Sequence, residues 1–304
     1  MPSASHSLPE LSGGRQRVAA VLTAYAPDER LRAVVESAVL QCSRVVVVDN
    51  SPPGAVTASD LVGAVPDVEI LVSPGNVGLA AALNRGIAHS GDSEFVLLLD
   101  QDSVLENPMV AQLAAHLDAD GSRAAAAPAP WDAEAGRYLD PRTRARETLA
   151  EMSAVITSGM LMRRSAFAAT VGMREDFFVD CVDQELCLQL RRAGWSIVQD
   201  KSLLLPHSLG ETQWHGPRFA RIRATHHPRW RLYWVARNGV MLSREYFRFD
   251  PRWAITNIAI LGYWMITVLL FEPPRLRRFS TMLRGIADGL RGRRNSAFLP
   301  GGGA

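Results

Sequence analysis

Four short runs of apolar, mostly β-branched residues occur at regular intervals in the first hundred residues of this chain. The runs span residues 18–23, 45–48, 68–72 and 95–99, and residues 27–39 and 79–88 carry apolar side chains at helical spacing. Continuous apolar runs of this length are typical of strands buried on both faces, as in a parallel sheet under helices. The alternation of strands and helices predicts an α/β fold with a mostly parallel sheet, right-handed crossovers and flanking helices.

The fourth run continues directly into two carboxylates, Asp100 and Asp102, with Gln101 between them. In open α/β sheets ligands bind at the carboxyl edge, which is where both acids would lie. Because residues i and i+2 of a strand share a face, the two side chains could reach one cation or one sugar phosphate together. The alternative is an ordinary exit from the strand, in which Asp102 caps a local turn.

Further polar residues follow other strands at the same predicted edge. Thr23 and Tyr25 end the first strand, and Asp49 lies just past the second. Asn76 and Gly78 precede a helix, whose first backbone N–H groups favour an anion, although an ordinary turn is the alternative. Such an edge could hold a base, a ribose and a diphosphate. The glycine spacing matches neither the dinucleotide fingerprint nor the P-loop pattern.

A second acidic segment lies in the middle of the chain, among aromatic and aliphatic residues. Its carboxylates are Asp176, Asp180, Asp183 and Glu185. Apolar surroundings raise the pKa of a carboxyl group and suit it to act as a general base. Asp183 also has the position of an N-cap, with Leu186 and Leu190 on the inner face of the helix that follows. Both roles stay open for Asp183.

Three other stretches carry weaker signals. Residues 131–151 mix charges with few apolar positions, and we expect a mobile loop over the site. Residues 155–162 predict a strand in which Gly159 marks the close approach of a ligand or another backbone.

His207 follows an apolar run and is by itself more typical of a structural residue. If the sheet edge holds a metal, His207 is the natural third protein ligand, suited to manganese.

The last third of the chain differs in composition. Arginine and aromatic residues alternate over residues 214–237, which suits phosphate capture, a membrane interface or a solvated amphipathic helix. Residues 253–271 form the most apolar segment, close to the roughly 20 residues that span a bilayer. A basic amphipathic helix follows Pro273 and Pro274, as in segments that adhere to anionic lipid. We expect residues 253–271 to lie in a membrane surface, with packing as a core helix as the alternative.

Charge and cysteine content narrow the class of protein. The net charge of +2 argues against a general nucleic-acid binder. Three cysteines without CxxC spacing favour a reduced, cytoplasmic setting. Residues 1–17 are rich in Pro, Ser and Gly and predict a disordered lead-in.

Taken in order, these motifs resemble family 2 of the inverting, GT-A-type glycosyltransferases, and within it the bacterial rhamnosyltransferase-like branch. The resemblance covers residues 18–294, and the ordered set of motifs is specific although each motif alone is weak. The motifs are Thr23-Ala24-Tyr25, Asp49-Asn50-Ser51, Gly75-Asn76-Val77-Gly78, Asn84-Arg85-Gly86, Asp100-Gln101-Asp102-Ser103, Asp180 with Asp183 and Glu185, and Arg237-Asn238. The Asp-Gln-Asp-Ser form resembles enzymes that use a deoxythymidine-diphosphate sugar.

The resemblance implies a donor site and a cofactor. Tyr25 and Asp49 would hold the pyrimidine, Asp100 would contact the ribose side, and Asp102 would bind a divalent cation that bridges the diphosphate. The cation would be Mn²⁺ or Mg²⁺, with Asp100 and His207 beside Asp102. The further residues expected on the donor side are Thr23, Asn76, Gly78 and Asn84.

The resemblance also implies a catalytic base, for which Asp183 matches the family position and Asp180 is a rival. The residues expected on the acceptor or donor-phosphate side are Ser158, Gly159, Asp180, Glu185 and Arg237. The chain departs from the family at Val182, where glutamate is usual, and at Gln189, where arginine is frequent.

The expected function is inverting transfer of a sugar, rhamnose from dTDP-rhamnose by family likeness, onto a cell-envelope glycan or lipid-linked acceptor. The enzyme would attach peripherally to the cytoplasmic face of the membrane. Residues 18–245 would form the Rossmann-like GT-A domain of nucleotide-diphospho-sugar transferases, and residues 246–304 a helical membrane-associating extension. The alternatives are an inactive sugar-nucleotide-binding scaffold for envelope enzymes and a metal-dependent nucleotidyltransferase.

Overall fold

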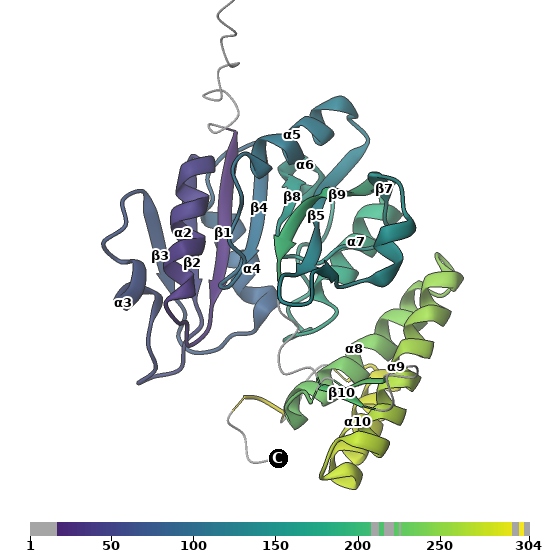
Figure 1. Ribbon diagram of the computed structural model, residues 1–304. Coiled ribbons are helices and arrows are strands. Elements are labelled where there is room, and N and C mark those ends of the chain that lie inside the picture. The colour runs from purple at the N-terminus through teal and green to yellow at the C-terminus, as the bar shows by residue number, and fades with distance from the viewer. Residues whose placement is uncertain (1–16, 208–212, 216–221, 225, 294–297, 301–304) are drawn as a thin grey trace, which may run out of the picture.

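A mixed sheet lies between two groups of helices, and three further helices pack beside it (Figure 1). The computed structural model describes residues 17–207, 213–215, 222–224, 226–293 and 298–300. The lead-in expected at residues 1–17 lies, apart from Arg17, outside these described residues.

The strands expected in the first hundred residues are present, parallel and in the order β3-β2-β1-β4. They are β1 (Val18–Ala24), β2 (Arg44–Asp49), β3 (Val68–Val72) and β4 (Phe95–Asp100). Side chains of β1, β2 and β4 are buried on both faces of the sheet, which explains why their apolar runs are continuous.

The sheet continues beyond β4 with strands of mixed direction. They are β8 (Met160–Arg163), β5 (Arg123–Asp132), β9 (Ser196–Pro206) and β7 (Leu149–Glu151), in that order. Strand β8 is antiparallel to both β4 and β5, and β5 is parallel to β9. The carboxyl ends of β1, β2, β4, β5 and β9 therefore meet at one edge. A separate two-stranded pair joins β10 (Gln213–His215) and β11 (Ile222–Ala224).

The prediction of a mobile loop at residues 131–151 was wrong. This segment contains the end of β5, then β6 (Arg137–Tyr138), which pairs with β5, a 3₁₀ helix η1 (Pro141–Ala145) and β7. Strand β7 pairs antiparallel with β9 and forms the edge of the sheet. Backbone hydrogen bonds can order an edge strand even when few of its side chains are buried. The polar composition of this segment therefore did not predict a strand.

The strand expected at residues 155–162 begins only at Met160. Gly159 precedes it with φ +80°, and a Cβ there would lie 2.8 Å from both Leu205 and Pro128. The close approach predicted at this glycine is therefore made by the protein itself.

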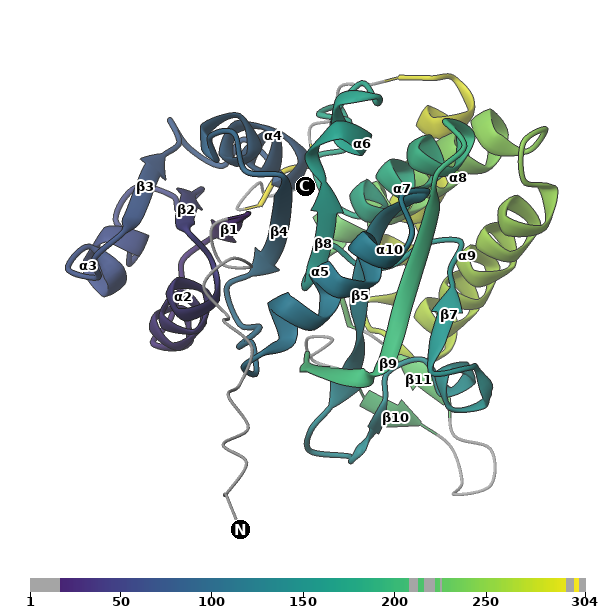
Figure 2. The same cartoon turned by 90° about the horizontal axis from the view of Figure 1, so that it is seen from above.

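Helices cover both faces of the sheet (Figure 2). Helices α2 and α5 pack on one face through the larger hydrophobic core, while α4 and α7 pack on the other. The bounds are α2 (Arg30–Gln41), α3 (Ala58–Val62), α4 (Leu79–His89), α5 (Met109–Ala119), α6 (Arg164–Ala168) and α7 (Val182–Arg192).

The C-terminal helices are α8 (Arg229–Tyr246), α9 (Pro251–Phe271) and α10 (Arg275–Leu290). Helix α8 joins two cores. Met241 and Leu242 pack in the core that contains α4 and α7, whereas Leu232 and Ala236 pack with α9 and α10. The helical structure expected for 253–271 and for the basic segment after the two prolines is confirmed.

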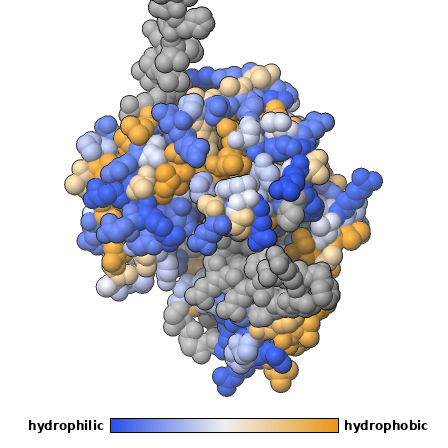
Figure 3. All heavy atoms as spheres, in the orientation of Figure 1, coloured by the Kyte–Doolittle hydropathy of each residue, from blue (hydrophilic) through white to orange (hydrophobic). Residues whose placement is uncertain are grey.

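Helix α9 is long and apolar enough to cross a membrane by length and composition, and 22% of its most apolar window is buried. One face, which includes Leu261 and Val268, packs against α8 and α10. The opposite face is exposed at Ile255, Ile266 and Leu270. Figure 3 shows apolar surface at the lower right, over the C-terminal helices. The expectation of a core helix therefore holds for one face of α9 only.

Candidate active site

A cavity of about 860 Å³ lies between the carboxyl edge of the sheet and the C-terminal helices. Its walls come from the ends of β1 and β4, the loop before α4, the segment before α7, and parts of α8 and α9. Four carboxylates come from the sheet edge and from the start of α7 with the segment before it, and four aromatic side chains come from the C-terminal region. The first group is Asp100, Asp102, Asp180 and Asp183, and the second is His227, Trp230, Tyr263 and Trp264.

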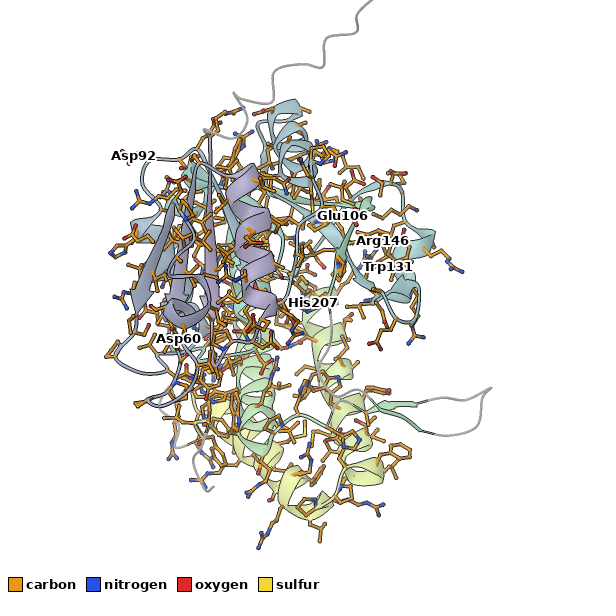
Figure 4. All side chains as sticks on the ribbon, turned by 60° about the vertical axis from the view of Figure 1, so that its left-hand side comes forward. Asp60, Asp92, Glu106, Trp131, Arg146 and His207 are labelled. Carbon is orange, nitrogen blue, oxygen red and sulfur yellow. The ribbon has the colours of Figure 1, made fainter. Side chains whose placement is uncertain are left out.

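Three potential metal ligands meet on the sheet side of this cavity. One ligand atom each from Asp100, Asp102 and His207 lies within 4.8 Å of the other two, the one such group found among the described residues. His207 reaches the aspartates because β9 ends at the same edge as β4, and its backbone N–H donates to the carbonyl of Trp131 at 3.0 Å. Figure 4 labels His207 where the sheet meets the C-terminal helices.

These residues fit a divalent cation. The Nδ1 atom of His207 is buried and has no hydrogen-bond partner in the described part of the chain. Such atoms are rare in proteins unless an ion or water satisfies them. Burial raises the pKa of Asp100, and the negative charge of Asp102 adds to this effect, so a positive charge here would be stabilising. Two carboxylates and an imidazole are a suitable donor set for Mn²⁺.

Asp183 lines the cavity from the first turn of α7. It is not the N-cap that its spacing suggested, because α7 begins at Val182, two residues earlier than expected, and Cys181 occupies the cap position. Leu186 and Leu190 are buried as expected. One carboxylate oxygen of Asp183 accepts the backbone N–H of Gln184 at 2.8 Å.

The environment of Asp183 makes its carboxylate a stronger base than usual. Burial raises the pKa of Asp183 to about 6, and the negative charges of Asp180 and Asp100 contribute. A carboxyl group with this pKa is ionised at neutral pH and still accepts a proton readily.

Asp180, the rival base, is held by a cation. Its carboxylate accepts hydrogen bonds from Nε and Nη2 of Arg231 on α8, at 2.9 to 3.1 Å. In the described part of the chain no arginine or lysine makes such a pair with Asp183. The geometry therefore favours Asp183 over Asp180 as the carboxylate that is available to a substrate.

The predicted donor residues Thr23, Tyr25, Asn76 and Gly78 all line the cavity. The backbone N–H of Tyr25 donates to the side-chain oxygen of Gln101 at 2.8 Å, which ties the end of β1 to the loop after β4. Gln101, which in the sequence only separates two acids, also lines the cavity. The Oδ1 atom of Asn76 accepts the N–H of Gly78 at 3.0 Å and shapes the turn before α4.

Two predicted donor residues do not line the cavity. Asp49 is 2% exposed, and its carboxylate accepts the backbone N–H groups of Ser51 and Ala58 at 2.8 and 2.7 Å. The next residue, Asn50, lines the cavity instead. Asn84 bonds both backbone polar groups of Met173 at 2.8 Å and thereby joins α4 to the chain before α7.

Four of the residues expected on the acceptor or phosphate side do not line the cavity either. Buried Ser158 accepts the backbone N–H of Asp100 at 3.3 Å, and Gly159 packs as described above. Glu185 is 3% exposed and bonds the side chains of Gln189 and Tyr246. Arg237 is completely buried. In this group only Asp180 lines the cavity.

The cavity residues from α8 and α9 were not identified from the sequence. The alternating arginine and aromatic residues of 214–237 indicated that this stretch could bind phosphate. Arg231 lies in this stretch and lines the cavity, whereas Arg237, chosen for its place in a motif, does not. On α9 the spacing of Ile260, Tyr263 and Trp264 marks one helical face that borders the cavity.

Comparisons with known proteins relate this chain to one family. Residues 20–170 match the family model of glycosyl transferase family 2. The chain is 26% identical over 241 residues to the dTDP-rhamnosyl transferase RfbF of Shigella flexneri, which covers 74% of this chain and 79% of the relative.

Solved structures share the fold at lower identity. The mannosyltransferase PcManGT from Pyrobaculum calidifontis, solved with GDP-Man and Mn²⁺, gives a TM-score of 0.58 at 15% identity, covering 96% of this chain and 91% of the other. A crystal structure of residues 1–349 of TarS from S. aureus gives 0.60 at 13% identity, covering 92% and 82%. These likenesses show the fold alone, and they confirm the α/β class that the sequence predicted.

Proposed function

The chain belongs to glycosyltransferase family 2, with the GT-A fold, and we propose that it transfers a sugar from a nucleoside-diphosphate donor to a hydroxyl group with inversion. The similarity to RfbF supports dTDP-rhamnose as the donor. The observation that carries the proposal is the single cavity that holds the cluster Asp100, Asp102 and His207 together with the basic carboxylate of Asp183.

The donor would bind along the carboxyl edge of the sheet. Thr23 and Tyr25 would lie against the nucleoside, and the turn at Asn76 and Gly78 would border the sugar or the diphosphate. The carboxylate of Asp49 is engaged by backbone N–H groups, so we assign it to shaping the loop after β2. In this proposal Asn50, which lines the cavity, is the polar side chain beside the nucleobase of the donor.

Asp100, Asp102 and His207 would hold a Mn²⁺ or Mg²⁺ ion, which when bound supplies positive charge against the leaving diphosphate. The similar mannosyltransferase was solved with Mn²⁺, which supports this assignment. Arg231 is the arginine on the cavity wall in the described residues, and it would add positive charge from the helical side.

The chemical step would use Asp183 as the general base. The carboxylate takes the proton of the acceptor hydroxyl as that oxygen bonds to the anomeric carbon. The bond from this carbon to the diphosphate oxygen breaks at the same time, and the nucleoside diphosphate leaves with the electron pair. Positive, oxocarbenium-like character develops on the sugar, as described for hydrolases of glycosides. Attack from the face opposite the leaving group inverts the anomeric centre.

The acceptor side of the cavity would be its helical wall. Ile260 and Tyr263 line the cavity and are nevertheless 47% and 44% exposed, so they form its rim. The exposed apolar face of α9 begins beside this rim. Basic residues of the neighbouring α10 are exposed at Arg275 and Arg284. Apolar and basic surfaces together suit peripheral binding at the cytoplasmic face of a membrane, with a lipid-linked or envelope-glycan acceptor.

The test is a nucleoside-diphosphate release assay over a panel of donor sugars, with membrane lipid extract as the acceptor and Mn²⁺ or Mg²⁺ present. The proposal predicts release of dTDP from dTDP-rhamnose that depends on the extract. Absence of release from every donor would contradict the proposed function. Release of pyrophosphate instead would identify a nucleotidyltransferase.

A further inference from the structure

The segment that leads into α7 has an unusual backbone. Asp180 and Cys181 are consecutive residues other than glycine with φ of +61° and +62°, in the left-handed region. This conformation costs free energy for side chains with a Cβ, and it persists only where surrounding contacts enforce it. Cys181 occupies the N-cap position of α7, and Asp183 lies two residues later. Contacts that hold this turn therefore also set the position of the Asp183 carboxylate.

Asn238 on α8 donates to the backbone of this turn, whereas Arg231 holds the Asp180 side chain. The Nδ2 atom of Asn238 donates to the backbone carbonyls of Val179 and Asp180, at 2.9 and 3.0 Å. Its Oδ1 atom accepts from Nη1 of Arg237 at 2.6 Å, which fixes the orientation of the amide. Asn238 is fully buried, so water cannot replace these bonds.

Arg237 supports Asn238 and holds the start of the same segment. Its Nη1 atom also donates to the carbonyl of Asp176 at 3.0 Å, and Nη2 lies 3.3 Å from the Asp176 carboxylate. Its Nε atom donates to the carbonyl of Arg293 at 2.8 Å. The Arg-Asn pair therefore clamps residues 176–180 and does not reach the cavity, although its sequence suggested a contact with phosphate.

The loop before α4 holds the turn through a different residue. The N–H of Leu79 donates to the carbonyl of Phe178 at 2.7 Å. Gly78 has φ +89°, and a Cβ on it would lie 2.7 Å from the same carbonyl oxygen. The glycine is thus required by close approach to this turn. The Phe178 ring also stacks on Trp234 of α8, with 5.5 Å between the ring centroids.

We propose that Asn238, supported by Arg237, is a positioning residue that fixes residues 178–181. It thereby holds Asp183 toward the cluster of Asp100, Asp102 and His207. This inference rests on the proposed function for its kinetic consequence. Its structural content, that Asn238 orders the first turn of α7, is independent of the reaction.

The decisive variant is Asn238→Asp, which keeps the size of the side chain and an acceptor for Arg237. It removes both N–H donors and places negative charge beside two carbonyl oxygens. We expect kcat to fall about 100-fold with the donor KM changed less than about twofold, since displacing a catalytic group by 1 Å can cost this much. Hydrogen exchange should accelerate at residues 180–187, where the N–H of Glu185 donates to Cys181 at 2.9 Å.

Asn257→Asp is the matched control. Asn257 is half-buried and also bonds α8, where its Nδ2 donates to the carbonyl of Gly239 and the hydroxyl of Ser243, but it does not touch the turn. We expect it to lower Tm while kcat stays within about twofold and exchange at 180–187 is unchanged. Asn238→Ala, which adds no charge, should reproduce the kcat loss of Asn238→Asp and guards against a folding failure of the first variant.

Two results would overturn the inference. One is an unchanged kcat in a folded Asn238 variant. The other is an equal loss of kcat in the Asn238 and Asn257 variants at matched Tm, which would indicate a general effect of stability. If the unaltered protein releases nucleoside diphosphate from no donor, the proposed function fails instead. Exchange at residues 180–187 then decides the structural part alone, and unchanged exchange in Asn238→Asp would refute it.

Discussion

The two walls of the cavity are built in different ways. The sheet wall collects the ends of strands, and its residues Asp100, Asp102 and His207 each follow an apolar run. The helical wall consists of side chains from α8 and α9, such as Arg231 and Trp264, within long helices that also pack elsewhere. Strand ends converge at one edge for any sequence that forms this sheet. Which face of a helix meets a cavity depends on tertiary packing.

The largest effect is expected where the two walls meet, at Asp183. Asp183→Asn removes the proposed proton acceptor and keeps the shape of the side chain. We expect kcat to fall about 10³-fold, within the range that general base catalysis contributes, while the affinity for the donor is retained. Steady-state kinetics of nucleoside-diphosphate release and calorimetry with the donor measure the two quantities.

Glu185→Gln is the control for this experiment. Glu185 is a second acid in the first turn of α7, with a pKa raised by burial, but it bonds Gln189 and Tyr246 away from the cavity. We expect its kcat to stay within about tenfold of the original. Comparable losses in the two variants would contradict the assignment of Asp183.

The difference between the walls also shows what the sequence could predict. The parallel strands, the acids at their ends and the place of His207 follow from apolar runs and from the rule that ligands bind at the carboxyl edge. Asp49 and Arg237 were assigned by motif, and the structure shows backbone and buried partners that no periodicity reveals. The role of α8 could not be predicted, because this helix packs in two hydrophobic cores. Its apolar residues serve both cores, so their spacing does not define a single buried face.

The second prediction tests the sheet wall through the proposed cation site formed by Asp100, Asp102 and His207. Asp102→Ala should lower Mn²⁺ affinity at least about 100-fold, because even residues behind a metal ligand change affinity by 10- to 100-fold. His207→Ala should have a similar effect, which would show that β9 contributes to the cluster. Titration calorimetry with Mn²⁺ alone measures both. His116→Ala, which removes an imidazole that bonds Asp200 at 2.7 Å outside the cavity, should leave Mn²⁺ affinity unchanged.

The third prediction concerns the charges near Asp183, which are those of Asp180 and of its partner Arg231 on the helical wall. The proposed base, Asp183, would act as a carboxylate, and its pKa is raised to about 6, so kcat should fall as the pH drops through about 6 and level off above it. Asp180→Asn removes a neighbouring negative charge that raises this pKa, and it frees Arg231, so the acidic limb should move to lower pH. A pH profile of kcat with saturating donor measures the limb. A limb that stays in place, or moves to higher pH, would show that Asp180 does not act on the base.

The smallest effect is expected on α9, where cavity and surface meet on one helix. Ile255 and Ile266 are 61% and 57% exposed and lie on the outer face, away from the cavity wall. If this face enters a lipid surface, Ile255→Ser with Ile266→Ser should lower partition into vesicles about tenfold, since burying an aliphatic side chain contributes roughly 1.5–3 kcal/mol when complete. Binding to vesicles with anionic phosphatidylglycerol should weaken with salt through the arginines of α10.

The matched variant Ile260→Ser alters the rim, so it should affect turnover of a lipid-linked acceptor more than partition. Equal partition of the outer-face double variant and the unaltered protein would show that α9 does not bind membranes by this face.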